Sequence, residues 1–113
     1  EALNASMEFN EVPSADATAY VAGQFLQSNT ATALEQIATQ NWIALFSQGV
    51  EAWTEWRRTG YPALSPAAQA DLSQIPSRYN YPTSENSINK ANYDAAVAAQ
   101  GADNLTTPVW WMN

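Results

Sequence analysis

Two glutamates, Glu51 and Glu55, lie four residues apart, and a pair of carboxylates is what a glycosidase uses as its acid and its nucleophile or base. On one helix, residues four apart share a face and point the same way, whereas glycosidase carboxylates flank the scissile bond across a cleft. Glu55 also precedes Arg58 by three residues, the spacing of a helical ion pair. We therefore expect structural roles for both acids and no catalysis, with a small glycoside hydrolase as the alternative.

Two of the four basic residues, Arg57 and Arg58, stand side by side just before Gly60. Guanidinium groups bind carboxylates through paired hydrogen bonds and stack on aromatic rings, so a ligand clamp is one reading. Trp53 lies four residues before Arg57, within reach of a cation–π contact. We favour the structural reading, in which the arginines cap helix carbonyls and link the following loop to the helix.

A third arginine, Arg78, follows the dipeptide Ile75-Pro76 in a stretch rich in proline. Its expected partners are Glu85 or backbone carbonyls, because guanidinium donors suit both. Such contacts would hold the loop in shape, and we favour this role over binding of a ligand.

Five tryptophans supply aromatic faces of the kind that stack on sugar rings, although core packing uses the same surfaces. Trp42 and Trp53 fall on predicted amphipathic helices and are expected in the core. Trp110 and Trp111 are adjacent in an extended tail, so both cannot point inward and one is expected to be exposed or covered by further chain. No individual residue is assigned to carbohydrate binding.

The chain lacks cysteine and histidine, which excludes disulfides, histidine-based catalytic triads and zinc sites built on these residues. The net charge is −7: residues 1–56 hold seven acids and no Lys or Arg, and residues 57–113 hold four of each sign. Such a chain repels phosphate backbones, so we expect no nucleic-acid partner.

The remaining acids do not suggest a metal site. Asp71, Glu85, Asp94 and Asp103 lack the spacing of a calcium-binding EF-hand loop. We therefore expect no metal and no cofactor.

The first elements are predicted from weak signals. Residues 1–14 are polar and expected to be irregular. Residues 15–27 are expected to form a short helix whose apolar side carries Tyr20, Phe25 and Leu26.

The clearest helix follows, because Thr32 and Glu35 match the capping box, in which each side chain satisfies an amide at the helix start. We expect a break at residues 47–49 and a second helix from Val50 to Thr59. Gly60 then takes the left-handed position that ends it. The predicted core stripe of the first helix comprises Leu34, Ile37, Ala38, Asn41, Trp42 and Leu45.

The second half reads as mostly loop. Residues 61–89 carry four prolines, with at most one helical turn at residues 67–72. Residues 89–99 are predicted helical, and the tail 106–113 is expected to be anchored by its apolar residues. An irregular stretch this long indicates either a functional surface or packing against further chain.

The order of several short motifs resembles the C-terminal region of the SusD/RagB family of glycan-binding outer-membrane lipoproteins of Bacteroidetes. Each motif is weakly specific alone, but their order extends over about two thirds of the chain. They are Gln40-x-Trp42, Glu51-x-Trp53, Arg57-Arg58-Thr59-Gly60-x-Pro62, Ile75-Pro76-x-Arg78, Tyr81-Pro82-x-x-Glu85, Asn89 with Asn92, and Trp110-Trp111.

The resemblance implies a mostly α-helical fold, an α–α superhelix with tetratricopeptide-like helices, of which residues 1–113 would be the loop-rich C-terminal portion. The chain would then be a fragment of a longer protein and would have the remainder of that protein as a partner.

The resemblance also implies a function without catalysis: capture of oligosaccharides at the cell surface and delivery to a TonB-dependent outer-membrane transporter. The location would be the outer membrane, through a lipid anchor on a cysteine that this chain does not contain. The alternative is a structural or interaction module that contacts the transporter and binds no ligand.

Overall fold

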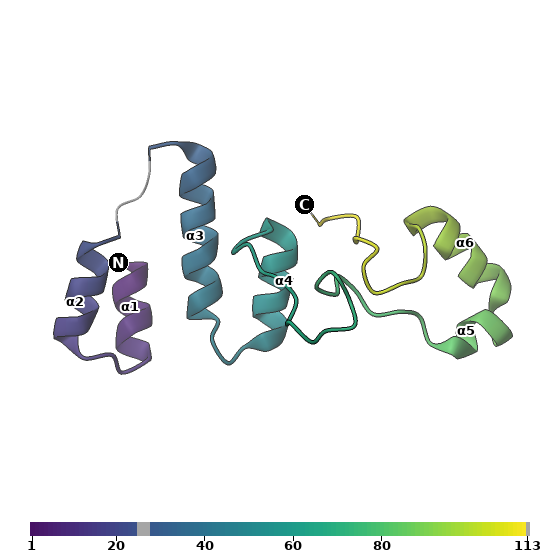
Figure 1. Ribbon diagram of the computed structural model, residues 1–113, viewed down its shortest axis with the longest axis horizontal. Helices are drawn as coiled ribbons and strands as arrows, with labels where there is room; N and C mark the ends of the chain where they lie inside the picture. The colour runs from purple at the N-terminus through teal and green to yellow at the C-terminus, as the bar shows by residue number, and fades with distance from the viewer. Residues whose placement is uncertain (25–27, 113) are drawn as a thin grey trace. The chain divides into compact units, whose positions relative to one another are not determined.

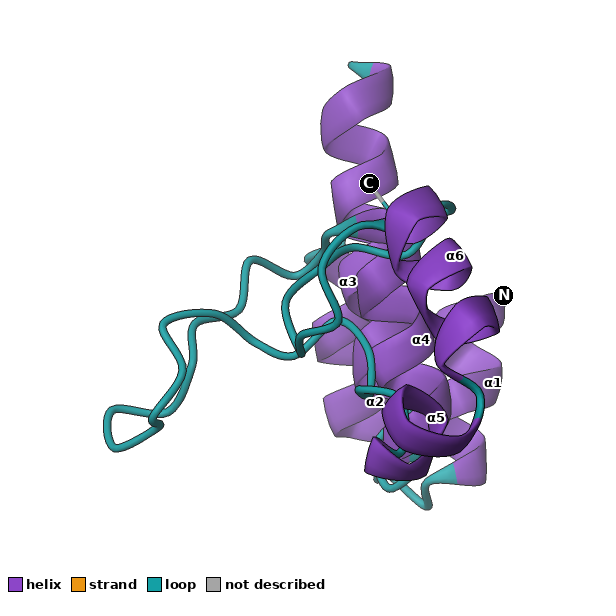
Figure 2. Ribbon diagram, turned by 90° about the vertical axis from the view of Figure 1, so that its right-hand side faces the viewer, coloured by secondary structure: helices purple, strands orange, loops and turns teal. Residues whose placement is uncertain are grey.

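The computed structural model describes residues 1–24 and 28–112, and the structure of this part of the chain is helical, without strands (Figures 1 and 2). The chain divides into two compact units, Glu1–Pro62 and Ala63–Asn113. The mostly α fold predicted from the sequence is therefore confirmed. The helices are α1 (Ala2–Phe9), α2 (Ser14–Ala22), α3 (Thr30–Ala44), α4 (Gly49–Thr59), α5 (Thr83–Ile88) and α6 (Lys90–Gln100).

Helices that are adjacent in sequence pack in pairs: α1 with α2, α3 with α4, and α5 with α6. A short connection between two helices brings them side by side, which is the helical hairpin from which tetratricopeptide-like arrays are built. The first unit contains two such pairs, and the second unit contains one.

Helix α1 corrects the expectation that residues 1–14 are irregular. Ala, Leu and Met favour helix enough to outweigh the polar residues among them, and Leu3 and Met7 bring a half-buried side to the element. Helix α2 follows Pro13 and confirms the predicted helix as far as Ala22. Phe25 and Leu26, expected on its apolar side, lie outside the described residues.

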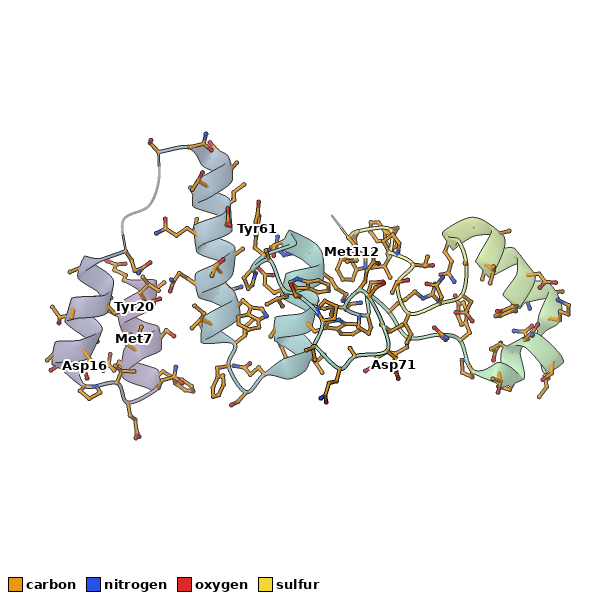
Figure 3. The ribbon with its side chains drawn as sticks, viewed as in Figure 1. Met7, Asp16, Tyr20, Tyr61, Asp71 and Met112 are labelled. Atoms are coloured by element: carbon orange, nitrogen blue, oxygen red, sulfur yellow. The ribbon has the colours of Figure 1, made fainter. Side chains whose placement is uncertain are left out.

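Tyr20 connects α2 to α3. Its hydroxyl exchanges hydrogen bonds with the Gln40 side chain, donating at 3.0 Å and accepting at 2.8 Å (Figure 3). This side-chain pair links the consecutive helices α2 and α3, and its polar atoms satisfy each other where they are partly buried.

Helix α3 begins three residues earlier than predicted, with its N-cap at Asn29 instead of Thr32. The Asn29 side-chain oxygen accepts hydrogen bonds from the amides of Ala31 at 3.0 Å and Thr32 at 3.3 Å, so Asn29 is the N-cap. The Thr32 capping box was a wrong prediction, because Asn caps as well as Thr and lies at the turn where the helix can first form.

The predicted break and second helix are confirmed. Leu45–Ser47 form a turn in which Ser47 has φ +70°, and α4 then begins at Gly49. Gly60 ends α4 in the left-handed conformation, with φ +73°, and its amide donates to the Trp56 carbonyl at 2.7 Å. Glycine is suited to this place because it lacks the Cβ that strains a left-handed residue.

The second unit contains one helix that the sequence analysis missed. Helix α5 starts directly after Pro82, whose fixed φ suits a helix start, within a stretch predicted to be loop. At residues 67–72 the chain makes a turn, closed by the Ala70 amide on the Ala67 carbonyl at 2.9 Å. Helix α6 confirms the prediction within one residue at each end.

The described residues contain little core. Ala38 is a buried hydrophobic residue, and Trp42 and Leu45 on the same side of α3 are half-buried. The predicted core stripe is wrong at Leu34 and Ile37, which are 58% and 53% exposed, and at Asn41, which is also exposed. The neighbouring helix covers only part of the α3 surface. In the part of the chain that the structure describes, no helix combines the length and apolarity needed to cross a membrane.

Candidate functional site

The C-terminal end of α4 holds the first two arginines of interest. The Arg57 guanidinium carbon lies 3.7 Å from the centre of the Trp53 ring, one turn earlier, as the spacing predicts. Its Nη2 also donates to Thr54 Oγ1 at 3.3 Å. A cation over an indole face contributes about 0.5–2 kcal/mol, so this contact stabilises the end of the helix.

Arg58 forms the predicted ion pair with Glu55. Arg58 Nη2 and Nε donate to the two carboxylate oxygens at 2.6 Å and 2.9 Å. These hydrogen bonds lower the pKa of Glu55, and a weaker contribution comes from a hydrogen bond with Asn41 of α3. The same pair raises the pKa of Arg58.

This pairing argues against a glycosidase centre at Glu51 and Glu55. A general acid must be protonated near neutral pH, which requires a raised pKa, whereas the Glu55 pKa is lowered. Each oxygen of its carboxylate accepts a hydrogen bond from the same guanidinium fork. Glu51 is exposed on the first turn of α4, where an acid interacts favourably with the helix dipole.

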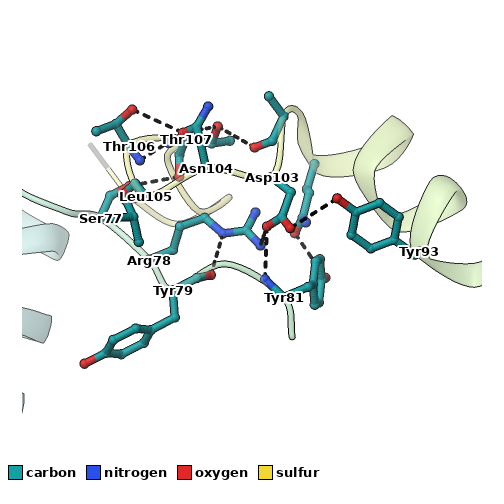
Figure 4. A network of polar contacts seen from close by, with 12 residues as sticks. Ser77, Arg78, Tyr79, Tyr81, Tyr93, Asp103, Asn104, Leu105, Thr106 and Thr107 are labelled. Carbon is teal, nitrogen blue, oxygen red and sulfur yellow. Dashed lines mark hydrogen bonds and ion pairs between the residues drawn. The ribbon is translucent and has the colours of Figure 1, made fainter. Parts of the chain in front are cut away.

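The second unit contains a polar network around Arg78 and Asp103, shown in Figure 4. Arg78 Nη2 lies 3.3 Å from Asp103 Oδ1, and both side chains are about nine-tenths buried. Asp103 Oδ1 also accepts from the Tyr81 amide at 3.1 Å, and Oδ2 accepts from the Tyr93 hydroxyl at 3.2 Å. We call these four residues the Arg78 network.

The expected partner of Arg78 was therefore partly wrong. Its carboxylate partner is Asp103 instead of Glu85, while the expected backbone contact exists, because Arg78 Nε donates to the Tyr79 carbonyl at 3.1 Å. The guanidinium also lies 5.2 Å from the centre of the Tyr81 ring. Burial raises the pKa of the Tyr93 phenol, and the Asp103 carboxylate, which accepts a hydrogen bond from this hydroxyl, adds to the rise.

Ser77 joins the same two segments beside the Arg78 network. Its amide donates to the Leu105 carbonyl at 2.7 Å, and its hydroxyl donates to the Thr107 carbonyl at 2.9 Å. Ser77 is 2% exposed, so these bonds are shielded from water. Together with the Arg78 network, they pin residues 77–81 to residues 103–107.

The structural roles of Ser77 and Asp103 were not predicted from the sequence. Asp103 is 25 residues from Arg78, and no local spacing connects such positions. One local signal was available: Asn104 Oδ1 accepts from the amides of Thr106 and Thr107 at 2.9 Å and 2.7 Å, and asparagine commonly starts turns in this way.

Two aromatic side chains are displayed outward by this part of the chain. Tyr79 is 80% exposed and points away from the Arg78 network in Figure 4. Trp110 is 95% exposed in a turn closed by the Met112 amide on the Val109 carbonyl at 2.9 Å. Trp111 is half-buried. The prediction that one member of the pair is exposed is therefore confirmed, and the exposed member is Trp110.

Comparison with known proteins identifies the family. Residues 3–112 match the family described as "SusD-like: Susd and RagB outer membrane lipoprotein". The chain belongs to the SusD-like family. Among proteins with curated descriptions, none matches the sequence.

Solved structures of SusD-like proteins have the same fold over this stretch. A chitin-binding protein is 36% identical, with a TM-score of 0.80 over 98% of this chain and 26% of its own. A Bacteroidetes AC2a SusD-like protein is 29% identical, with a TM-score of 0.85 over 98% of this chain and 24% of its own. A chitin-binding SusD homologue from Flavobacterium johnsoniae is 35% identical, with a TM-score of 0.64 over 78% of this chain and 20% of its own.

Two of these solved relatives match 98% of the residues of this SusD-like chain, and the chain spans about a quarter of the length of each relative. Of the residues that carried the resemblance, Trp53, Arg57 and Arg58 make contacts within α4, and Arg78 and Tyr81 join two segments in the Arg78 network. Among the described residues there is no cluster of three or more potential metal ligands.

Proposed function

We propose that this chain is the C-terminal portion of a longer SusD-like protein that binds oligosaccharides at the bacterial cell surface. In this proposal the protein is held at the outer membrane by a lipid anchor outside these residues, and it passes bound glycan to a TonB-dependent transporter. The protein acts by binding and carries out no catalysis.

One observation carries the proposal. The chain shares 36% identity over 98% of its residues with a protein named as chitin-binding, and 35% identity over 78% with a chitin-binding SusD homologue. The family description as outer membrane lipoproteins supports the location. Chitin-type glycans, polymers of N-acetylglucosamine, are therefore the first ligands to test.

The chemistry of the described residues suits binding better than reaction. Of the two carboxylates that a glycosidase centre would need, Glu55 is paired with Arg58, and this pairing lowers its pKa, which does not suit a general acid. Aromatic rings supply the flat apolar surfaces on which sugar rings stack. Trp110 and Tyr79 expose most of their ring surface and are the candidates in this chain for such contacts.

Affinity electrophoresis of the full-length protein tests the proposal. We expect slower migration in native gels that contain soluble chitin derivatives than in gels without polysaccharide. Phe9→Ala, which removes another exposed ring, should leave this retardation unchanged, whereas Trp110→Ala should reduce it.

The other results have defined meanings. Migration unaffected by chitin derivatives and by other polysaccharides would favour the alternative, a module that contacts the transporter and carries no ligand. Release of reducing sugar that Glu51→Gln abolishes would overturn the non-catalytic proposal.

A further inference from the structure

The second unit contains an apolar groove of 680 Å³, formed by residues 65–76 and by Leu105. Among its described lining residues one, Asp71, carries a charge, and Asp71 is marked in Figure 3. The other walls are mainly small or aliphatic side chains, which include Pro66, Ala67, Ala70, Leu72 and Ile75.

The groove is poorly suited to a sugar. Its volume falls within the range of ligand sites, but such sites place several polar groups around the ligand. The described lining contains no aromatic ring on which a pyranose could stack, and its surface is mostly apolar. The chemistry that fits these walls is another aliphatic or aromatic side chain.

The backbone around the groove also indicates a packed surface. Residues 60–82 contain no helix, although loops longer than about 12–15 residues are uncommon in compact domains unless they are functional or unstructured. Within this stretch, residues 63–70 are exposed apart from Pro66. Leaving aliphatic walls in water forgoes the stabilisation that comes from burying apolar surface.

We propose that an apolar segment of the remaining SusD-like polypeptide docks into this groove. The inference rests on the proposal that the chain is a portion of a longer protein. Its support is the length of the relatives: this chain superposes along 98% of its residues on proteins about four times as long, with TM-scores of 0.80 and 0.85. The rest of such a polypeptide is covalently tethered, which gives it a high effective concentration at the groove.

A second copy of the chain is a weaker occupant. Although the net charge of −7 is carried by residues 1–56, outside the groove, it still disfavours association of two copies, and Asp71 adds an acid in the groove wall itself. A tethered segment does not have to overcome this repulsion at every encounter.

Thiol labelling tests the docking. Residues 1–113 contain no cysteine, and the full-length protein without an introduced cysteine, labelled in parallel, gives the background from any thiol outside these residues. Ala70→Cys places the thiol in the groove, and Ala98→Cys places a matched thiol on an exposed position of α6. Each variant is made in the full-length protein. It is then treated with a maleimide, once under native conditions and once in urea. Ser65→Cys, a nearly isosteric change in the groove wall, is used if Ala70→Cys fails to fold.

We expect native labelling of Ala70→Cys to be at least about tenfold slower than in urea, because a buried thiol reacts only when the segment opens. Ala98→Cys should label at similar rates in both conditions. The protection should be independent of protein concentration and of added chitin oligosaccharide.

Rapid native labelling of Ala70→Cys, or equal protection of Ala98→Cys, would overturn the docking proposal. Protection that appears only at high protein concentration would assign the groove to a second copy, and protection that requires the oligosaccharide would assign it to the ligand; each refutes a docked segment. Because glycan binding is measured separately by gel retardation, failure of the proposed function and failure of the docking are distinguishable.

Discussion

Removal of the Asp103 carboxylate should destabilise the protein far more than removal of an exposed acid. Asp103 accepts from Arg78, from the Tyr81 amide and from the Tyr93 hydroxyl, so Asp103→Ala leaves a nine-tenths buried guanidinium without its counter-ion. Breaking a fully buried ion pair costs about 3–5 kcal/mol, and each buried donor left unsatisfied costs about 1–3 kcal/mol. Because the pair retains some contact with water, we expect a loss of about 3 kcal/mol.

Urea unfolding of the protein in its full encoded length measures this loss. The matched control is Asp94→Ala, which removes the acid of the exposed Lys90–Asp94 pair and should cost less than about 0.5 kcal/mol. A double-mutant cycle with Arg78→Ala separates the pair from its surroundings, and its coupling energy should be about 1.5–3 kcal/mol. Equal costs for Asp103→Ala and Asp94→Ala, or a coupling energy near zero, would refute the role assigned to the Arg78 network.

Three further predictions concern the first unit, each measured by denaturant unfolding. Gly60→Ala should cost about 1–2 kcal/mol, because a Cβ strains a residue held at the left-handed φ of +73°, even though the added Cβ would meet no neighbouring side chain within 4 Å. Gly49→Ala is the control: it lies in a helix and should not destabilise the protein. Asn29→Ala should cost about 0.5–2 kcal/mol while Thr32→Ala costs less, and the reverse order would restore the capping box. Because the pKa of Glu55 is lowered on folding, the Glu55–Arg58 pair stabilises the fold above the unfolded pKa of Glu55, and this stability is lost as pH falls through the folded pKa. Glu55→Gln should therefore make the free energy of unfolding less sensitive to acid. An unchanged dependence of that free energy on pH would contradict this.

Features fixed by contacts within one helix were predictable, because the helical period determines which side chains meet. The Trp53–Arg57 stacking, the Glu55–Arg58 pair and the left-handed Gly60 follow from spacings of four, three and one residue. Helix α1 was missed because its polar residues hide a propensity that is weak at each position. Helix α5 was missed because Pro82 was read as part of a loop, although proline also starts helices.

Contacts between distant segments were beyond local reasoning. Arg78 was correctly given a loop-holding role, but its partner lies 25 residues away instead of seven, and sequence spacing carries no information on such a choice. The exposure of Leu34 and Ile37 was also unpredictable, since a helical stripe indicates which residues share a face and not what covers that face.

The residues that reveal the family are therefore different from those that would select a glycan. Arg57, Arg58 and Arg78 each form contacts that shape helix ends or loops, and such contacts serve any ligand equally well. In the proposed function, selection among sugars depends instead on surfaces displayed outward, and Tyr79 and Trp110 are our candidates among the exposed aromatic residues. It follows that substitution of the arginines should lower stability without changing which glycan is preferred, whereas substitution of the exposed rings should change glycan affinity with little loss of stability.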